Sequence, residues 1–396
     1  MKTPVALRAV LAELVGRPSV NPDGDAGNSR AGEKDIADWV ASYLRGIGAA
    51  VEMRPLAPDR PNVVAVFEPI GKPVATVAFV PHLDTVGVTG MVVPPFALTP
   101  RAGRLFGRGA CDTKGPMAAI LWALRRWARS AACRRNRVRW VVAATAGEEQ
   151  GSLGAEKLLS GGFDADFAIA LEPTALRVVF GAKGILRVWI ESRGRAAHGS
   201  NPAKGDNAVY RLLPLALALR DEAAPALAGR RHPLLGPASL NLGVMEGGRE
   251  LNVVPDACRL GLDIRHHPGI SSGEVLRLLE ALRDRHEPGA RLTVVRSGRP
   301  FVTDRRNDWA RRLRRAGRGW ATADWFCDAN VFAAAEIPAV AFGPGSIAQA
   351  HTRDEYIEAA ELSSGADAFY RFLTDDSRSA SAVSAFKPRQ RSSTRR

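Results

Sequence analysis

Side chains that commonly bind metal ions or transfer protons follow several apolar or glycine-rich stretches of this sequence. In VAFVPHLDTV, GRGACDTKG, VVAATAGEE, FAIALEP and GPGSIAQAH these residues are His82, Asp84, Asp112, Glu148, Glu149, Glu172 and His351. Singly, each has an ordinary interpretation, such as a helix cap, a solvated turn or a surface histidine. Their shared position after predicted strands favours a common function, because ligands of open α/β sheets collect at the carboxyl ends of the strands.

Two histidines and three carboxylates make a suitable ligand set for two zinc-like ions. One carboxylate would bridge the ions, and one histidine and one carboxylate would complete each site, which leaves room for a shared water. Neighbouring side chains point in different directions, so we expect one of Glu148 and Glu149 to bind a metal and the other to accept a proton from the water. Asp84 is expected to lie on the same side of its strand as His82 and to orient the His82 ring.

The elements that must position these residues alternate between helix and strand. EKDIADWVASYLRGIG and MAAILWALRRWAR have helical patterns, and PNVVAVFE and VATVAFV are typical of short strands. VRWVVAATA and ADFAIALE are continuous apolar runs, as expected of central parallel strands. The alternation predicts an α/β fold in which helices cover a mostly parallel sheet.

The pattern changes from about residue 182. ILRVWIESRG, ASLNLGVMEGG and CRLGLDIRHH resemble half-exposed antiparallel strands, with helical stretches near 206–221 and 272–286. The α/β character returns with EIPAVAFGPG. We therefore expect a catalytic domain at 1–181 and 295–376, interrupted by an α+β lid or dimerisation domain at 182–294. Residues 377–396, rich in Ser and Arg, are expected to form a basic disordered tail.

Composition narrows the class of protein. A chain of 396 residues favours two domains, and 46% hydrophobic with 24% charged residues is ordinary for a soluble globular protein. No stretch approaches about 18 uninterrupted apolar residues, so no membrane partner is expected. The net charge of +14 raises the question of a nucleic-acid partner, but the basic residues are scattered and no recognition motif accompanies them. Nucleic-acid binding is therefore disfavoured.

Cysteine usage and the start of the chain bear on the compartment. The four cysteines, Cys111, Cys133, Cys258 and Cys327, are widely spaced and form no CxxC pair. MKTPVALRAVLAELVG has the pattern of an amphipathic helix and not of a signal peptide. Together these features predict reduced thiols and a cytoplasmic location.

An ordered set of motifs resembles a known family. HLDTV, GRGACDTKG, AGEEQGS, LEPT, AAHGSNPAKGDNA and GPGSIAQAH are similar to motifs of the co-catalytic zinc aminoacylase/carboxypeptidase family, peptidase M20. The resemblance runs from about residue 5 to 373, nearly the whole chain outside the tail. It implies amide hydrolysis that depends on two divalent metal ions. Zinc is the expected metal, and cobalt is expected to be able to replace it.

The resemblance also implies a role for each candidate residue. Asp112 would bridge the metals, His82 and Glu172 would complete one site, Glu149 and His351 would complete the other, and Glu148 would be the general base. Some relatives have Asp at the position of Glu172, and both residue types ligate zinc.

Further site residues are implied in the inserted domain and in one turn. In the family a lid histidine donates to the oxyanion across a dimer interface, and the matching residue here is His198; a histidine in a polar turn is the plainer interpretation. Arg265, together with Asn252, would bind the substrate carboxylate. The plainer interpretation of Arg265 is a salt bridge to Asp263 or Glu250. Gly345 and Ser346 could donate hydrogen bonds to substrate or serve only a turn.

The implied substrate is a small acylated amino acid. GPGSIAQAH, TRDEYIE and CDANVF resemble family members that hydrolyse N2-acetyl-ornithine to ornithine and acetate in arginine biosynthesis more than their relatives that act on succinyl-diaminopimelate. Desuccinylation, or another aminoacylase or carboxypeptidase activity, is the alternative. A metal-binding scaffold or a nucleic-acid-binding protein is the non-enzyme alternative; a scaffold would tolerate loss of one carboxylate at 148–149, and this chain keeps both.

Overall fold

The computed structural model describes residues 3–24 and 31–375, which form two compact units. The first comprises the described parts of Met1–Arg177, Asp308–Gly319 and Phe342–Arg396, and the second comprises Val178–Asn307 and Trp320–Ala341. The predicted tail at 377–396 lies outside the described residues. These units are defined by contacts within the chain. The predicted division by function, into a catalytic domain and a lid domain at 182–294, stays a prediction.

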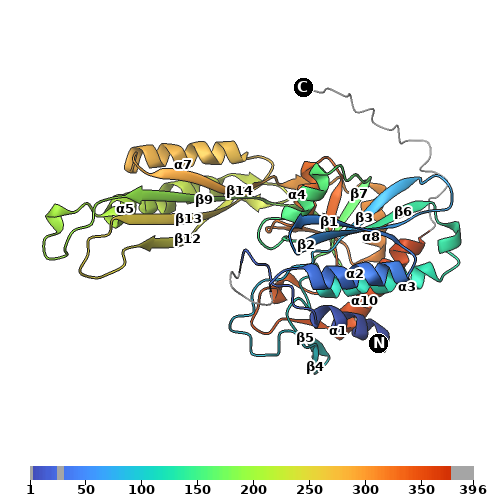
Figure 1. Cartoon of the computed structure of the whole chain (residues 1–396). Helices are drawn as coiled ribbons and strands as arrows, with labels where there is room; N and C mark the ends of the chain where they lie inside the picture. Colours follow the sequence, from blue (N-terminus) through green and yellow to red (C-terminus); the bar gives the residue numbers. More distant parts are fainter. Residues whose placement is uncertain (1–2, 25–30, 376–396) are drawn as a thin grey trace. The chain divides into compact units, whose positions relative to one another are not determined.

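The first unit is built on strands whose parallel members lie at the centre. In spatial order they are β1 (Ala50–Ala57), β2 (Arg60–Phe67), β6 (Val138–Ala144), β3 (Ala75–Val80) and β7 (Phe167–Ala170) (Figure 1). β3 pairs in parallel with both β6 and β7, whereas β1 and β2 pair antiparallel at the edge. The predicted α/β class with a mostly parallel sheet is confirmed.

Helices cover these strands and complete the core of the first unit. They are α1 (Val5–Val15), α2 (Lys34–Gly46), α3 (Lys114–Ala128), α4 (Leu153–Ser160), α8 (Asp308–Ala316) and α10 (Ala359–Thr374). Figure 1 shows α2, α3 and α10 along one face of the sheet. Phe79 of β3 meets the rings of Phe369 and Phe372 of α10 edge-on, with centroids 6.0 Å apart in each pair. Such aromatic packing makes the sheet a rigid mount for the loops at its edge.

A small antiparallel sheet connects two loops of the first unit. β5 (Arg104–Phe106) pairs with β4 (Thr99–Arg101) on one side and with β18 (Tyr356–Glu358) on the other. β5 leads directly into GRGACDTKG, and β18 begins shortly after His351. The pairing therefore fixes the ends of two segments that carry predicted metal ligands.

The second unit contains a four-stranded antiparallel sheet covered on one face by helices. Its order is β12 (Ser239–Gly247), β13 (Ala257–His266), β9 (Gly184–Arg193) and β14 (Arg291–Gly298), with α5 (Ala208–Ala218) and α7 (Ser272–His286) packed against it. Along β13, Cys258, Leu260, Leu262 and Ile264 are buried while the residues between them are not, as the alternating pattern predicts. Ser271 and Glu274 form a capping box that begins α7.

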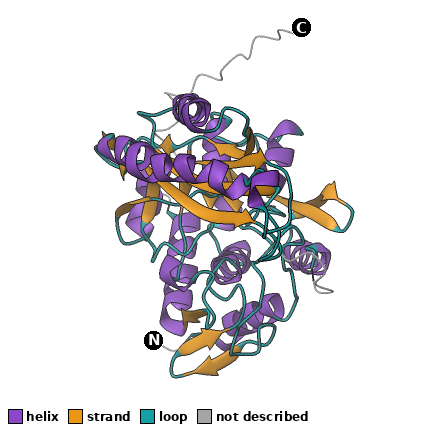
Figure 2. Cartoon of the chain, turned by 90° about the vertical axis from the view of Figure 1, so that its left-hand side faces the viewer, coloured by secondary structure: helices purple, strands orange, loops and turns teal. Residues whose placement is uncertain are grey.

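The remaining elements are shorter, and Figure 2 distinguishes helices from strands by colour. They are β8 (Val178–Ala182), α6 (Ala224–Gly229), β10 (Arg231–His232), β11 (Gly236–Pro237), β15 (Phe301–Val302), β16 (Trp320–Ala323), α9 (Asp328–Ala334) and β17 (Ala339–Ala341). None of the helices in the described part of the chain combines the length and apolar character that a membrane span requires.

Candidate metal centre and active site

Four predicted ligands meet where the parallel strands of the first unit end. His82 follows β3 and forms a parallel bridge to Thr145, just beyond β6. Its Nε2 lies 3.1 Å from Oδ1 of Asp112. Nε2 of His351 lies 3.4 Å from the other oxygen of Asp112 and 3.0 Å from Oε2 of Glu149. Asp112 thus presents one carboxylate oxygen to each histidine, as a carboxylate shared between two metal ions would.

The donor set fits a divalent metal ion. Ligand atoms of His82, Asp112 and Glu149 all lie within 4.8 Å of one another. Oε1 of Glu149 is buried and has no hydrogen-bond partner, which is costly for a carboxylate that serves only the fold. Imidazole and carboxylate donors together are typical of zinc and related ions.

Glu172 lies at the same edge, two residues beyond β7, and is buried. Its segment is fixed by backbone bonds: Leu171 N–H donates to the carbonyl of Val80 over 2.9 Å, and the hydroxyl of Thr113 donates to the carbonyl of Leu171. The compact ligand group among the described residues contains His82, Asp112 and Glu149. Metal ligation by Glu172 therefore stays a prediction.

The carboxylates and histidines shift one another's pKa values. Hydrogen bonds that Asp112 and Glu149 accept from His351 raise the pKa of His351 to about 10. Burial lowers the pKa of His82, but hydrogen bonds to Asp112 and Asp84 outweigh it and hold that pKa well above the usual range. Burial raises the pKa of Glu149. A metal ion would have to displace protons from the two histidines before binding.

Asp84 holds the turn that carries the adjacent glutamates. Its two carboxylate oxygens accept the backbone N–H of Glu148 and of Glu149, each over 3.0 Å, and one of them also accepts Asn21 Nδ2 over 2.7 Å. Nδ1 of His82 lies 2.9 Å from the backbone carbonyl of Asp84 and 3.6 Å from its carboxylate. The His82 ring is thus oriented mainly by the Asp84 carbonyl, while the carboxylate positions Glu148 and Glu149.

In the second unit, two adjacent turns bring His198 and Asn252 together. Gly199 N–H donates to the carbonyl of Asn252 over 2.6 Å, and His198 forms an antiparallel bridge with Val253. Both side chains are exposed. Nδ1 of His198 accepts the backbone N–H of Ser200 over 3.1 Å, so the neutral ring carries its proton on Nε2, where it could be donated to an oxyanion.

Arg265 is paired within the four-stranded sheet of the second unit. Its Nε lies 2.6 Å from Oδ1 of Asp263, which is the salt-bridge interpretation that the sequence left open. Asp263 also accepts Nε of Arg187, over 3.0 Å. Two guanidinium groups therefore share one carboxylate, so Asp263 would keep a cationic partner if Arg265 turned to a substrate.

Gly345 and Ser346 form a tight turn in the first unit. Gly345 has φ of +92°, and a Cβ there would lie 2.7 Å from Sγ of Cys111. Oγ of Ser346 accepts the N–H of Ala348 over 3.4 Å at the start of a short 3₁₀ turn. These contacts give both residues a structural role, and their contact with substrate stays a prediction.

The comparisons with known proteins agree with this geometry. The model of peptidase family M20/M25/M40 matches residues 78–375. The chain belongs to this family. An acetylornithine deacetylase of Myxococcus xanthus is 32% identical over 376 residues, which cover 90% of this M20 chain and 94% of that protein.

Solved structures share the fold of this M20 chain. An M20 family metallo-carboxypeptidase, Sso-CP2 from Sulfolobus solfataricus, has a TM-score of 0.79 at 18% identity and covers 93% of this chain and 98% of its own. A dinuclear metal-binding M20 peptidase from Bacillus subtilis has a TM-score of 0.64 at 13% identity, with coverage of 93% and 97%. Family membership and the clustered ligands make this chain a metal-dependent hydrolase of the peptidase and deacylase type.

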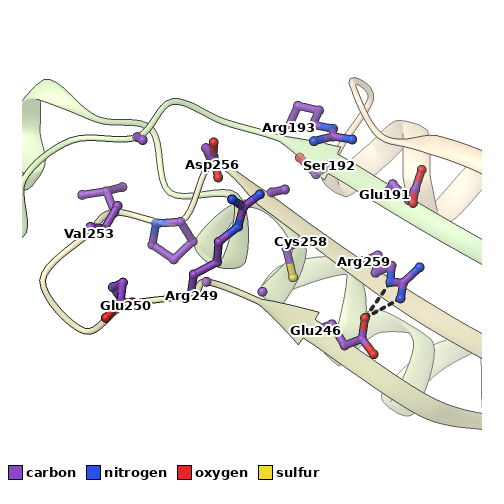
Figure 3. Close-up of a pocket in the computed structure, with 16 residues that line it drawn as sticks. Glu191, Ser192, Arg193, Glu246, Arg249, Glu250, Val253, Asp256, Cys258 and Arg259 are labelled. Carbon is purple, nitrogen blue, oxygen red and sulfur yellow. Dashed lines mark hydrogen bonds and ion pairs between the residues drawn. The ribbon is translucent and has the colours of Figure 1, made fainter.

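A separate cavity of about 500 Å³ lies in the second unit, and its lining includes Ser192, Arg249 and Cys258 (Figure 3). In Figure 3 the ion pair between Arg259 and Glu246 lies along its wall. The cavity contains none of the predicted metal ligands. The candidate metal site at the strand edge of the first unit is therefore distinct from this cavity.

Sequence reasoning missed two residues that hold the site in place. Asn21 binds the Asp84 carboxylate, and the buried Glu355 accepts the backbone N–H of Asp112 over 2.9 Å. The signal for Glu355 was slight: an acidic residue in the TRDEYIE stretch, four residues after His351. The sequence does not show which backbone N–H groups Glu355 binds.

Proposed function

We propose that this protein hydrolyses the amide bond of an N-acylated amino acid, with N2-acetyl-ornithine as the first candidate and ornithine and acetate as the products. The observation that carries the proposal is the Asp112 carboxylate, which faces His82 with one oxygen and His351 with the other. The relative named acetylornithine deacetylase supports the substrate. This reaction would place the enzyme in arginine biosynthesis, and a cytoplasmic location remains the prediction from its cysteines.

Two divalent ions, zinc first and cobalt as a substitute, would be held by His82, Asp112, Glu149, Glu172 and His351. Bound there, they would polarise the scissile carbonyl and acidify the attacking water. The protein's contribution is a set of ligands fixed by the rigid sheet edge and by the loops that Asp84 and Glu355 hold. This pre-organisation lowers the cost of assembling the site.

Glu148 is the proposed general base. Its backbone is held by Asp84 beside Glu149, and its side chain is half-buried, as expected of a base that must meet both the ion site and an incoming substrate. It would take a proton from the attacking water and return it to the leaving amine. Asp84 contributes by fixing the turn.

The substrate would be held mainly by residues of the second unit. Arg265 is proposed to leave Asp263 and grip the α-carboxylate, while Arg187 keeps Asp263 paired. Asn252 would add a hydrogen bond, and His198 would donate from Nε2 to the tetrahedral oxyanion. Gly345 and Ser346 are proposed as additional donors from the first unit.

A homodimer formed through the inserted domain is part of the proposal. Tyr210, Leu213 and Leu217 are exposed on α5, and Val244 and Met245 are exposed on β12 at the edge of the lid sheet. Exposed apolar side chains beside an open strand edge favour pairing with a second copy. His198 would then act on the partner's site.

The test is a comparison of kcat/KM on N2-acetyl-ornithine, other acetyl-amino acids, succinyl-diaminopimelate and a glutamate-terminated peptide. N2-acetyl-ornithine is expected to lead. If kcat/KM for succinyl-diaminopimelate or the peptide is tenfold higher, a difference of about 1.4 kcal/mol in transition-state binding, the acetyl substrate would be wrong. The proposed amide hydrolysis would stand. Absence of chelator-sensitive hydrolysis on the whole panel would overturn the function.

A further inference from the structure

Glu355 is a buried carboxylate that the proposed reaction does not use. It lies four residues after His351 and directly before β18, and it is 1% exposed. One carboxylate oxygen accepts the backbone N–H of Cys111 over 2.8 Å and that of Asp112 over 2.9 Å. The other accepts the N–H of Gly109 and Nη1 of Arg108, both over 2.8 Å. All four donors belong to the segment that ends at the proposed bridging ligand.

The backbone of this segment wraps around Glu355. Gly107 N–H donates to the backbone carbonyl of Glu355 over 3.1 Å, so a further hydrogen bond joins the two segments. Gly109 has φ of +77°, and a Cβ there would lie 2.9 Å from Cδ of Lys114, so the conformation requires glycine. The coiled segment directs its N–H groups inward, where only an acceptor with two oxygens can satisfy all of them.

We propose that Glu355 is a positioning residue for the metal centre, holding the Asp112 segment against the His351 segment so that both ligands face the same ions. The inference rests on the proposed metal site. Glu355 connects the two ligands in two ways. Its side chain accepts a hydrogen bond from the backbone of Asp112, and its backbone belongs to the same chain segment as His351. If the carboxylate is replaced, the spacing between the bridging ligand and the terminal histidine changes.

The sharpest variant is Glu355→Gln, which keeps the size of the side chain. Its single carbonyl oxygen can serve one pair of donors, and its NH₂ group must then face the other pair. Glu358→Gln is the matched control, because Glu358 lies three residues further along the chain, at the end of β18, but forms an exposed ion pair with Arg104. Both substitutions remove one negative charge.

Metal-free full-length proteins would be titrated with Zn²⁺ by calorimetry, and their Co²⁺ complexes compared by visible absorption. We expect Glu355→Gln to bind Zn²⁺ at least tenfold more weakly than the wild type and to give an altered Co²⁺ spectrum. Glu358→Gln should bind within threefold of the wild type. Thermal unfolding of the metal-free proteins separates a general loss of stability from a loss of metal affinity in the folded protein.

Glu355→Asp covers the case in which the glutamine variant does not fold. It keeps the buried charge and both acceptor oxygens but draws them back by one methylene, so it should bind Zn²⁺ at least fivefold more weakly with a shifted Co²⁺ spectrum. Wild-type affinity and spectrum in a folded Glu355 variant would overturn the positioning role. Failure of the wild type itself to bind Zn²⁺ would instead overturn the proposed metal centre, and this inference with it.

Discussion

The proposed metal ligands of the first unit and the proposed substrate-binding residues of the second unit are held in different ways. His82 and Asp112 are buried and contact each other, and buried carboxylates hold the loops around them. His198 and Asn252 are exposed on turns, and Arg265 is paired with Asp263. The contrast indicates that the proposed metal site is pre-formed, whereas the proposed substrate-binding residues would need substrate, a partner subunit or a change of side-chain contacts to complete their site.

Removal of the proposed base would sharpen this contrast most. Glu148→Gln should lower kcat by roughly 10²–10⁴-fold, because no other group would take the proton, while Zn²⁺ stays bound at the wild-type ratio. Steady-state kinetics and metal analysis of the same sample check both parts. Retained turnover, or loss of metal in parallel with activity, would contradict the role of Glu148.

Loss of the lid donor should have the next largest effect. His198→Ala should lower kcat by about 10²–10³-fold, as expected when one oxyanion donor is removed, without loss of metal. If His198 acts in the partner's site, exchange of subunits with Glu148→Gln should restore activity. At most about a quarter of the sites would be complete, since half of the dimers are mixed and each mixed dimer has one complete site.

Subunit exchange must be verified independently, for example by mass spectrometry of differently labelled proteins. No gain of activity after verified exchange would show that His198 acts within its own subunit or not at all. The proposal for the metal centre does not depend on that result.

The grip on the substrate carboxylate should give a smaller effect, mainly on KM. Arg265→Met should lower kcat/KM by about 10–100-fold, in line with ~1.5–3 kcal/mol for hydrogen bonds to a charged group. Arg259→Met is the control, because Arg259 lies on the same strand and pairs with Glu246. Equal kinetic effects of the two substitutions would indicate a general change in the lid sheet and no specific grip.

The last expected effect is on stability near the proposed metal centre and not on turnover. Burial lowers the pKa of Lys114 from 10.5 to about 7, and its Nζ donates to the carbonyl of Arg17. Between these values the unfolded chain binds one proton more than the folded chain, so stability rises with pH. Relative to Lys114→Met, the wild-type free energy of unfolding should rise by at most about 1.4 kcal/mol per pH unit across this window and stay level below it.

Urea unfolding of both metal-free proteins at several pH values would measure this difference. Parallel curves for the wild type and Lys114→Met would mean that Lys114 is not neutral in the folded protein. The result concerns the proposed metal site of the first unit, because Lys114 is the first residue of helix α3, which follows the Asp112 segment.

The sequence was sufficient for the features that follow from periodicity and motif order. The apolar run of β7 and the alternation along β13 predicted a buried parallel strand and a half-exposed antiparallel strand, and both are confirmed. The shared edge of His82, Glu149 and Glu172 followed from the rule that ligands collect at the carboxyl ends of parallel strands, here β3, β6 and β7. Asp112 follows the antiparallel strand β5, so its contact with His82 required the fold. The M20 family itself followed from the order of the motifs and is confirmed.

Features that depend on long-range backbone contacts could not be predicted. The role of Glu355 arises from N–H groups presented by a loop more than 200 positions away in the chain, and no residue type marks those groups. Likewise, the sequence placed Asp84 beside His82 but gave no sign that its carboxylate also accepts the backbone N–H groups of Glu148 and Glu149. Residue types revealed the ligands, whereas the connections among them required the fold.

The central claim is that Asp112 joins two metal ions at the strand edge of the first unit, and metal stoichiometry tests it most directly. Metal-free wild type and Asp112→Ala would be titrated with Zn²⁺ by calorimetry, with bound zinc counted after dialysis. We predict two zinc ions per wild-type chain and loss of tight binding at both sites in Asp112→Ala, because a bridging ligand serves both ions. Two tightly bound ions in folded Asp112→Ala, or none in the wild type, would contradict the account.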